Sequence, residues 1–245
     1  MKKSGDEIEQ KVTRTLLITG INPSTNPKLI RSEISKHGAI KETYTSQQNP
    51  SILFIIFYDI RESQKVFETF NNTQLLGSNI KMYYTTSRYE VPKEIDKCDE
   101  TKNQGTIRLV YRTDKDEPIS MTEVRHILKP FPHIKAIREK TSTSKFIEFY
   151  DTRSTDMAYT QLNNSPYKEG KLGIKYVWDL SNKQRLDIAS NTEKILRSCV
   201  VEKKKEEIIE NAKRRKESSG VKKNFYLKML DDFIAEHVKE IEKLL

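Results

Sequence analysis

One pattern of eight residues occurs twice in this chain. It reads F-I-x-F-Y-D-x-R and covers residues 54–61 (FIIFYDIR) and 146–153 (FIEFYDTR). A repeat of this length indicates two copies of one structural unit. Each copy has a strand-like run, a helical stretch and a second strand before it, and a helical stretch and a closing strand after it. The repeat therefore predicts two consecutive α+β units with the order βαββαβ, which is a ferredoxin-like arrangement.

The expected strands are rich in β-branched and aromatic residues, and the expected helices carry apolar residues at helical spacing. The first unit is predicted to have strands at 15–21, 40–46, 52–57 and 79–85, with helices within 26–38 and 63–72. The second unit is predicted to have strands at 106–112, 134–140, 145–150 and 173–178, with helices near 121–130 and 155–163.

The length of the chain, 245 residues, suits two small domains with an extension. The repeat and the polar, turn-rich segment between its copies predict five parts. These are a disordered N-terminus at 1–12, a first domain at 13–87, a linker at 88–104, a second domain at 105–181 and a basic helical tail at 182–245. The linker is short enough to keep the two domains near each other.

Charge and cysteine content narrow the function classes. The formal net charge of +9 favours anionic partners, although a soluble protein with a basic tail would give the same value. Cys98 and Cys199 are far apart and lack nearby histidines at ligand spacing, so we expect no disulfide, metal or cofactor, and a reducing intracellular setting. No apolar run approaches the roughly 20 residues of a membrane helix, so we expect neither secretion nor membrane insertion. Without HExxH, a glycine-rich phosphate loop or a nucleophile motif, the chain is not expected to be an enzyme.

Two βαββαβ units in tandem resemble RNA-recognition motif (RRM) domains. An RRM binds single-stranded RNA on the open face of its sheet, where aromatic rings stack on bases and basic side chains contact phosphates. Strand alternation places a set of candidate RNA-binding residues on that face. They are Leu17, Tyr44, Ile52, Phe54, Lys81 and Tyr83 in the first domain, and Arg108, Arg138, Ser144, Phe146 and Lys175 in the second.

Phe54 and Phe146 occupy the same position in the two third strands, which favours an RNA-facing role over the core position usual for a mid-strand aromatic. Leu17, Ile52 and Ser144 stand where an aromatic is common in RRMs, so stacking is weakened there. The polar and tyrosine candidates could equally form an ordinary solvated sheet face.

The register of the first strand in the second domain is open by one residue. The preferred register turns Ile107 and Leu109 inward and leaves Arg108 exposed, while Phe57 and Phe149 are assigned to the cores.

The Y-D-x-R half of the repeat follows the third strand in each copy. Asp59 and Asp151 are predicted to cap or turn the chain before the second helix rather than to act as catalytic acids. Arg61 and Arg153 could contact phosphate or solvate the start of that helix.

Several segments resemble the Mei-two-like family of RNA-binding proteins, which regulate meiosis and differentiation. The resemblance runs from about Arg14 to Asp179. It is carried by RTLLITGI (14–21), GAIKETYTS (38–46), FYDIR (57–61), VPK (91–93), NQGT (103–106), IKAIRE (134–139) and KFIEFYDTR (145–153). It implies tandem RRMs that bind RNA for RNA regulation, in the nucleus, the cytoplasm or both.

The sequence also departs from the family pattern. Leu17 and the pair Ser51-Ile52 replace the Phe and Gly-Phe typical of the family's first domain. The family's third RRM is expected to be absent or vestigial, since only VKKNFYLKMLDDFIAE (221–236) faintly resembles the start of its first helix.

The tail is predicted to form helices at 192–215 and 224–245, broken near residues 218–220. The second helix carries an apolar stripe of Tyr226, Met229, Leu230, Phe233, Ile234, Val238, Ile241 and Leu245, which could dock on the chain itself or bind a protein partner. The basic patch Lys213, Arg214, Arg215 and Lys216 could bind phosphates, act as a nuclear localisation signal or form a solvated helix face.

Two functions follow from these features. The first is a single-stranded RNA binder that uses both sheet faces with help from the tail patch. The second is a protein-interaction scaffold with degenerate RRMs, favoured by Leu17, Ile52 and Ser144 and by the amphipathic tail helix.

Overall fold

The structure is a computed structural model that describes residues 11–46, 49, 51–88, 91, 97–98, 100–102, 104–218 and 232–238. Its internal contacts divide the chain into two compact units, Met1–Ala189 and Ser190–Leu245. The first unit contains both predicted domains, and the second contains most of the tail.

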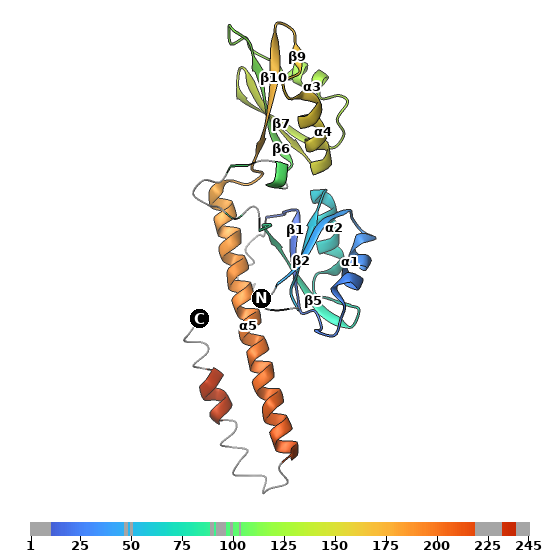
Figure 1. Cartoon of the computed structure of the whole chain (residues 1–245), viewed down its shortest axis with the longest axis vertical. Helices are drawn as coiled ribbons and strands as arrows, with labels where there is room; N and C mark the ends of the chain where they lie inside the picture. The colour runs from blue at the N-terminus through green and yellow to red at the C-terminus, as the bar shows by residue number, and fades with distance from the viewer. Residues whose placement is uncertain are drawn as a thin grey trace, which may run out of the picture. The chain divides into compact units, whose positions relative to one another are not determined.

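The first domain runs through β1 (Thr15–Thr19), α1 (Pro27–Ser35), β2 (Ile40–Thr45), β3 (Leu53–Phe57), α2 (Ile60–Phe70), β4 (Thr73–Leu75) and β5 (Ser78–Thr85). Its strands pair antiparallel in the order β2-β3-β1-β5-β4. Both helices lie on one side of this sheet (Figure 1). There Ile30 and Val66 join Leu16, Ile55 and Phe57 in a buried core.

The second domain repeats this plan with β6 (Thr106–Arg112), α3 (Met121–Ile127), β7 (Ile134–Thr141), β8 (Ser144–Phe149), α4 (Thr152–Leu162), β9 (Pro166–Tyr167) and β10 (Gly170–Val177). The strand order is β7-β8-β6-β10-β9, again antiparallel. Ile107, Leu109, Val124, Ile147 and Phe149 form its core. The two βαββαβ units with matching strand order are tandem RRM domains, as predicted.

Helix starts in both domains are marked by capping side chains. Asp59 accepts a hydrogen bond from the backbone N of Arg61 at 2.8 Å, and Asp151 accepts one from the N of Arg153 at 2.8 Å. The predicted capping role of both aspartates is therefore confirmed, because each supplies an acceptor to an otherwise unpaired N–H of α2 or α4. These helices start at Ile60 and Thr152, a few residues before the predicted starts.

The tail begins with α5 (Asn182–Ser218), which starts before the predicted residue 192. Ser181 and Gln184 explain the early start, because the Gln184 side chain accepts from the backbone N of Ser181 at 3.0 Å and its own N donates to the Ser181 hydroxyl. Further on, residues 232–238 are helical, whereas most of the second predicted tail helix, with Tyr226, Met229, Leu230, Ile241 and Leu245, lies outside the described residues.

Two searches of the described residues gave negative results. No helix there is both long and apolar enough to cross a membrane. No group of three or more His, Cys, Asp and Glu side chains in the same part of the chain is placed to hold a metal ion.

Candidate nucleic-acid interface

In each domain, four candidate residues form one row across the outer face of the sheet. In the first domain Tyr44 pairs with Phe54, Phe54 with Leu17, and Leu17 with Tyr83, each from a neighbouring strand. Directly opposed residues in a sheet have neighbouring side chains on the same face. The sheet register therefore brings residues that are far apart in the sequence into a single surface, which we call the first row.

The second row is built in the same way in the second domain. Arg138 pairs with Phe146, Phe146 with Arg108, and Arg108 with Lys175. The preferred strand register is confirmed, because Ile107 and Leu109 lie in the core and Arg108 therefore faces outward. The two rows occupy equivalent strands but differ in chemistry, since the first is aromatic and aliphatic and the second is mainly cationic.

The first row is largely shielded from solvent. Leu17 is 0% exposed and Phe54 is 8% exposed, and Ile52 beside them is also buried. The Tyr44 ring stacks on Phe54 with 4.7 Å between ring centroids and 10° between planes. Arg88 covers Tyr44 in turn, with its guanidinium carbon 5.0 Å from the ring centroid. This stacking occupies the face of Phe54 that a base would use.

The β5 end of the first row is more open. Tyr83 is half-buried and Lys81 is exposed. The Lys81 ammonium lies 5.4 Å from the centroid of the Tyr83 ring. Of the first domain's candidates, these two present a ring and a cation to solvent together.

The second row is more accessible and carries the charge that an RNA backbone requires. The Arg138 side chain is 60% exposed, Lys175 is exposed, and Phe146 and Arg108 are half-buried. Lys140 places its ammonium 5.7 Å from the Phe146 centroid. One accessible ring surrounded by four cations matches the combination of stacking and phosphate contact that RRMs use.

Acidic and polar neighbours hold the second row in place. Glu148 accepts from Lys135 at 2.7 Å and lies 3.4 Å from the Arg138 guanidinium. Ser144 is buried, 2.7 Å from the Thr141 hydroxyl and 3.4 Å from Nη2 of Arg108. The serine therefore orients Arg108 rather than presenting a surface to a base.

Lys145 is a structural residue of this site that the sequence did not reveal. Its side chain is 1% exposed, and its ammonium donates to Thr141 O at 2.9 Å, Ser142 O at 3.1 Å and Glu139 Oε1 at 3.2 Å. A buried cation is stable only when such acceptors surround it. The bonds close the β7–β8 hairpin, which carries both Arg138 and Phe146.

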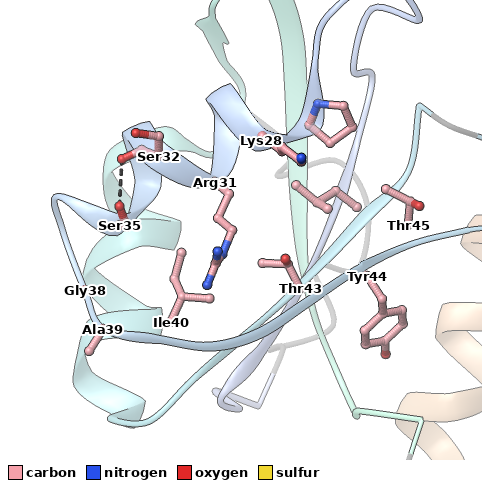
Figure 2. Close-up of a pocket in the computed structure, with 12 residues that line it drawn as sticks. Lys28, Arg31, Ser32, Ser35, Gly38, Ala39, Ile40, Thr43, Tyr44 and Thr45 are labelled. Carbon is pink, nitrogen blue, oxygen red and sulfur yellow. Dashed lines mark hydrogen bonds between the residues drawn. The ribbon is translucent and has the colours of Figure 1, made fainter.

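A groove of about 680 Å³ lies elsewhere in the first domain, between α1 and the edge strand β2. Figure 2 shows Arg31 reaching from α1 toward β2, while the Tyr44 ring points away from α1. Tyr44 is the one aromatic residue among those that line the groove. The groove thus offers cations without a ring to stack on, and the rows are the better candidates for RNA.

The basic patch of the tail is described only in part. Lys213 is exposed, whereas the side chains of Arg214, Arg215 and Lys216 lie outside the described residues. In the same tail, Phe233 of the predicted apolar stripe is 48% exposed.

Comparison with known proteins gives several plant relatives, and no family model matches the chain. MEI2-like 2 of rice is 30% identical over 62% of this chain and 17% of its own length. MEI2-like 3 of rice is 26% identical over 73% of this chain and 18% of its own length, and MEI2-like 5 of Arabidopsis thaliana is 28% identical over 62% and 18%. The chain thus spans less than a fifth of each of these relatives.

Solved structures with two RRM domains also match. RRMs 1 and 2 of Drosophila melanogaster Sex-lethal share 13% identity over 67% of this chain and 100% of theirs, with a TM-score of 0.28. The first two RRMs of the yeast poly(U) binding protein share 14% identity over 69% and 100%, with a TM-score of 0.29. The fold assignment rests on the strand order given above. Over 62% to 73% of its length, the chain is a distant homologue of the plant MEI2-like proteins.

Proposed function

We propose that this protein binds single-stranded RNA and that the second row makes the principal contacts. The observation that carries this proposal is the accessible Phe146 ring flanked by Arg108, Arg138 and Lys175. A base can stack on the ring while the cations neutralise adjacent phosphates, and no particular base edge is required for either contact. Homology to the MEI2-like proteins supports the same function.

The first domain has a smaller direct role in this proposal. Tyr83 and Lys81 offer one stacking surface and one cation at the β5 side of the first row. Leu17, Ile52, Phe54 and Tyr44 contribute mainly to the rigidity of the sheet, because they are shielded or already stacked. Lys213, with Arg214, Arg215 and Lys216, adds nonspecific attraction for phosphates.

Substitution of Phe146 tests the proposal most directly. Phe146→Ala should weaken binding of a fluorescently labelled single-stranded RNA by about 1–3 kcal/mol, the typical value of one stacked base. Arg108→Ala should flatten the dependence of log K on log salt by about 0.7, because one phosphate contact is lost. Fluorescence anisotropy at several salt concentrations measures both effects.

Arg125→Ala is the matched control, because Arg125 is exposed on α3, on the helical side of the same domain. It removes one positive charge and should leave affinity nearly unchanged. Unchanged binding by both Phe146→Ala and Arg108→Ala would exclude the second row as the RNA site.

The shielded first row favours a second candidate function for the first domain, a protein-interaction platform. Leu17 and Ile52 make this part of the sheet aliphatic where an RRM usually presents rings. This function predicts that Tyr83→Ala leaves RNA affinity unchanged but that replacing Leu17 abolishes capture of a protein partner. A several-fold loss of RNA affinity in Tyr83→Ala would instead assign the first row to RNA.

A further inference from the structure

The Y-D-x-R half of the repeat lies where the two domains meet rather than on the sheet faces. The backbone N of Ile60 donates to Tyr150 O at 3.0 Å, and the backbone N of Thr152 donates to Tyr58 O at 3.0 Å. Asp59 and Asp151 lie opposite each other as an antiparallel bridge. Equivalent atoms of the two copies thus bind each other, so the contact is reciprocal.

The arginines of the motif add a second pair of reciprocal contacts. The guanidinium carbon of Arg61 lies 4.4 Å from the ring centroid of Tyr150, and that of Arg153 lies 4.9 Å from the centroid of Tyr58. Cations at this distance over an aromatic face are attracted by its electrons. Each arginine therefore reaches out of its own domain onto the tyrosine of the other copy.

The aspartates hold these arginines in position. Arg61 donates from Nε and Nη2 to Asp59, at 3.1 and 2.5 Å, and Arg153 donates in the same way to Asp151, at 3.0 and 2.5 Å. Because these bonds lie within one domain, each arginine is oriented whether or not the other domain is bound. Little side-chain freedom is then lost when the domains dock.

Arg14 adds a one-sided contact to this interface. Its side chain, 5% exposed, leaves the start of the first domain and forms an ion pair with Asp179 of the second. Its Nη2 also donates to Phe149 O at 2.8 Å. A Cβ at Gly105 would collide with this guanidinium, so the glycine leaves the space that Arg14 occupies.

We propose that Tyr58–Arg61, Tyr150–Arg153 and Arg14 form an interdomain clasp that fixes the two RRMs in one orientation before RNA binds. The clasp replaces independent domains on a linker with a preset pair of sheets. The RNA partner it fits is a single strand long enough to meet the second row and the open Tyr83 side of the first row together, and this part rests on the proposed function. Fixed domains hold the second site at a high effective concentration once the first is occupied.

Domain tumbling tests the clasp without RNA. In the full chain, 15N relaxation should give both domains the same rotational correlation time. In Tyr58→Leu/Tyr150→Leu combined with Arg14→Met, and in Arg61→Ala/Arg153→Ala, each domain should tumble faster and separately. The aspartate caps remain in these variants, so the domains themselves should stay folded, as amide chemical shifts in the two cores can verify.

Arg31→Ala/Arg125→Ala is the matched control, since it removes one exposed arginine from a helix of each domain and leaves the clasp intact. It should tumble like the wild type. Separate correlation times in the wild type, or a single shared time in both clasp variants, would overturn the proposal.

RNA length provides the second readout. An RNA of about 4 nucleotides, enough for one sheet, should bind the wild type and the clasp variants alike, whereas one of about 16 nucleotides should bind the variants roughly tenfold more weakly. Equal affinities of wild type and variants for the longer RNA would overturn the preset pair. A wild type that binds neither RNA would refute the proposed function, and the relaxation test would still decide the clasp.

Discussion

Asp59 has two roles, because it caps α2 and holds Arg61 over the other domain. Burial raises the pKa of this carboxyl, but hydrogen bonds from the Arg61 side chain and backbone and the charges of Arg61 and His133 outweigh burial, so its pKa lies below the ordinary value. A carboxyl with a lowered folded pKa stabilises the fold above its unfolded pKa of about 3.9. That stability is lost as pH falls from there through the folded pKa.

We therefore expect Asp59→Asn, which retains a cap acceptor, to destabilise the first domain at pH 7 and to match the wild type in strong acid. Asp59→Ala should cost about 0.5–2 kcal/mol at pH 7 through the lost cap. Urea unfolding measured between pH 7 and pH 2 provides the comparison. If the wild type and Asp59→Asn keep a constant difference down to pH 2, the charge of Asp59 makes no contribution.

Single residues also show what the sequence could reveal about the site. The capping role of the aspartates was predictable, because Asp before a helix satisfies a local N–H whatever the tertiary structure. The contacts of Arg61 and Arg153 with the opposite domain were not predictable, because a local pattern contains no information on how two domains dock. Gly105 gave the one signal for Arg14, yet a glycine at the start of a strand has many explanations.

At the scale of elements, the β4–β5 hairpin contains a correctable defect. Leu76 and Gly77 form its turn with φ of 50° and 76°, and Leu76 is 48% exposed. Two consecutive positive φ values are those of a type I′ turn, which favours Asn-Gly and disfavours a bulky side chain at the first position. Leu76→Asn should therefore stabilise the first domain by about 0.5–1 kcal/mol.

Thermal unfolding of Leu76→Asn, with exposed Leu29→Asn on α1 as the comparison, would measure this gain. Leu29 has helical backbone and is 57% exposed, so its replacement by the poorer helix former should not raise the melting temperature. A melting temperature of Leu76→Asn at or below that of the wild type would show that the turn is not strained.

Strand and helix predictions succeeded where apolar periodicity was long and failed where elements were short. The main strands of both sheets were found, because their alternation reflects one face on a core and one outside. The strands β4 and β9 were missed, since three and two residues carry no measurable alternation. The shielding of Leu17 and Phe54 was also missed, because the pattern assigns a side chain to a face but does not show what covers that face.

For the whole molecule, the two halves of the repeat serve different purposes. The F-I-x-F half places Phe54 and Phe146 on the sheets, where the surrounding rows have become aliphatic in one domain and cationic in the other. The Y-D-x-R half makes the same contacts in both copies, because a reciprocal interface needs the same groups on each side. One repeat thus specifies two different sheet faces and one shared domain contact.

A shared contact couples the stabilities of the domains, and the chain's one tryptophan, Trp178, can report this coupling from the second domain. Phe57→Ala should cost the first domain about 3–5 kcal/mol, because Phe57 is fully buried in its core. In moderate urea the first domain then unfolds while the second remains folded without its partner. The urea midpoint reported by Trp178 should therefore fall, by the equivalent of about 1–3 kcal/mol for two cation–π contacts and the interdomain hydrogen bonds.

The same substitution in the Tyr58→Leu/Tyr150→Leu/Arg14→Met background is the control for this coupling. There the clasp is already broken, so Phe57→Ala should leave the Trp178 midpoint where the background sets it. The difference between the two backgrounds measures the free energy of the clasp directly, without RNA. Equal shifts in both backgrounds would mean that the first domain stabilises the second by another route, and no shift in either would mean that the domains are independent.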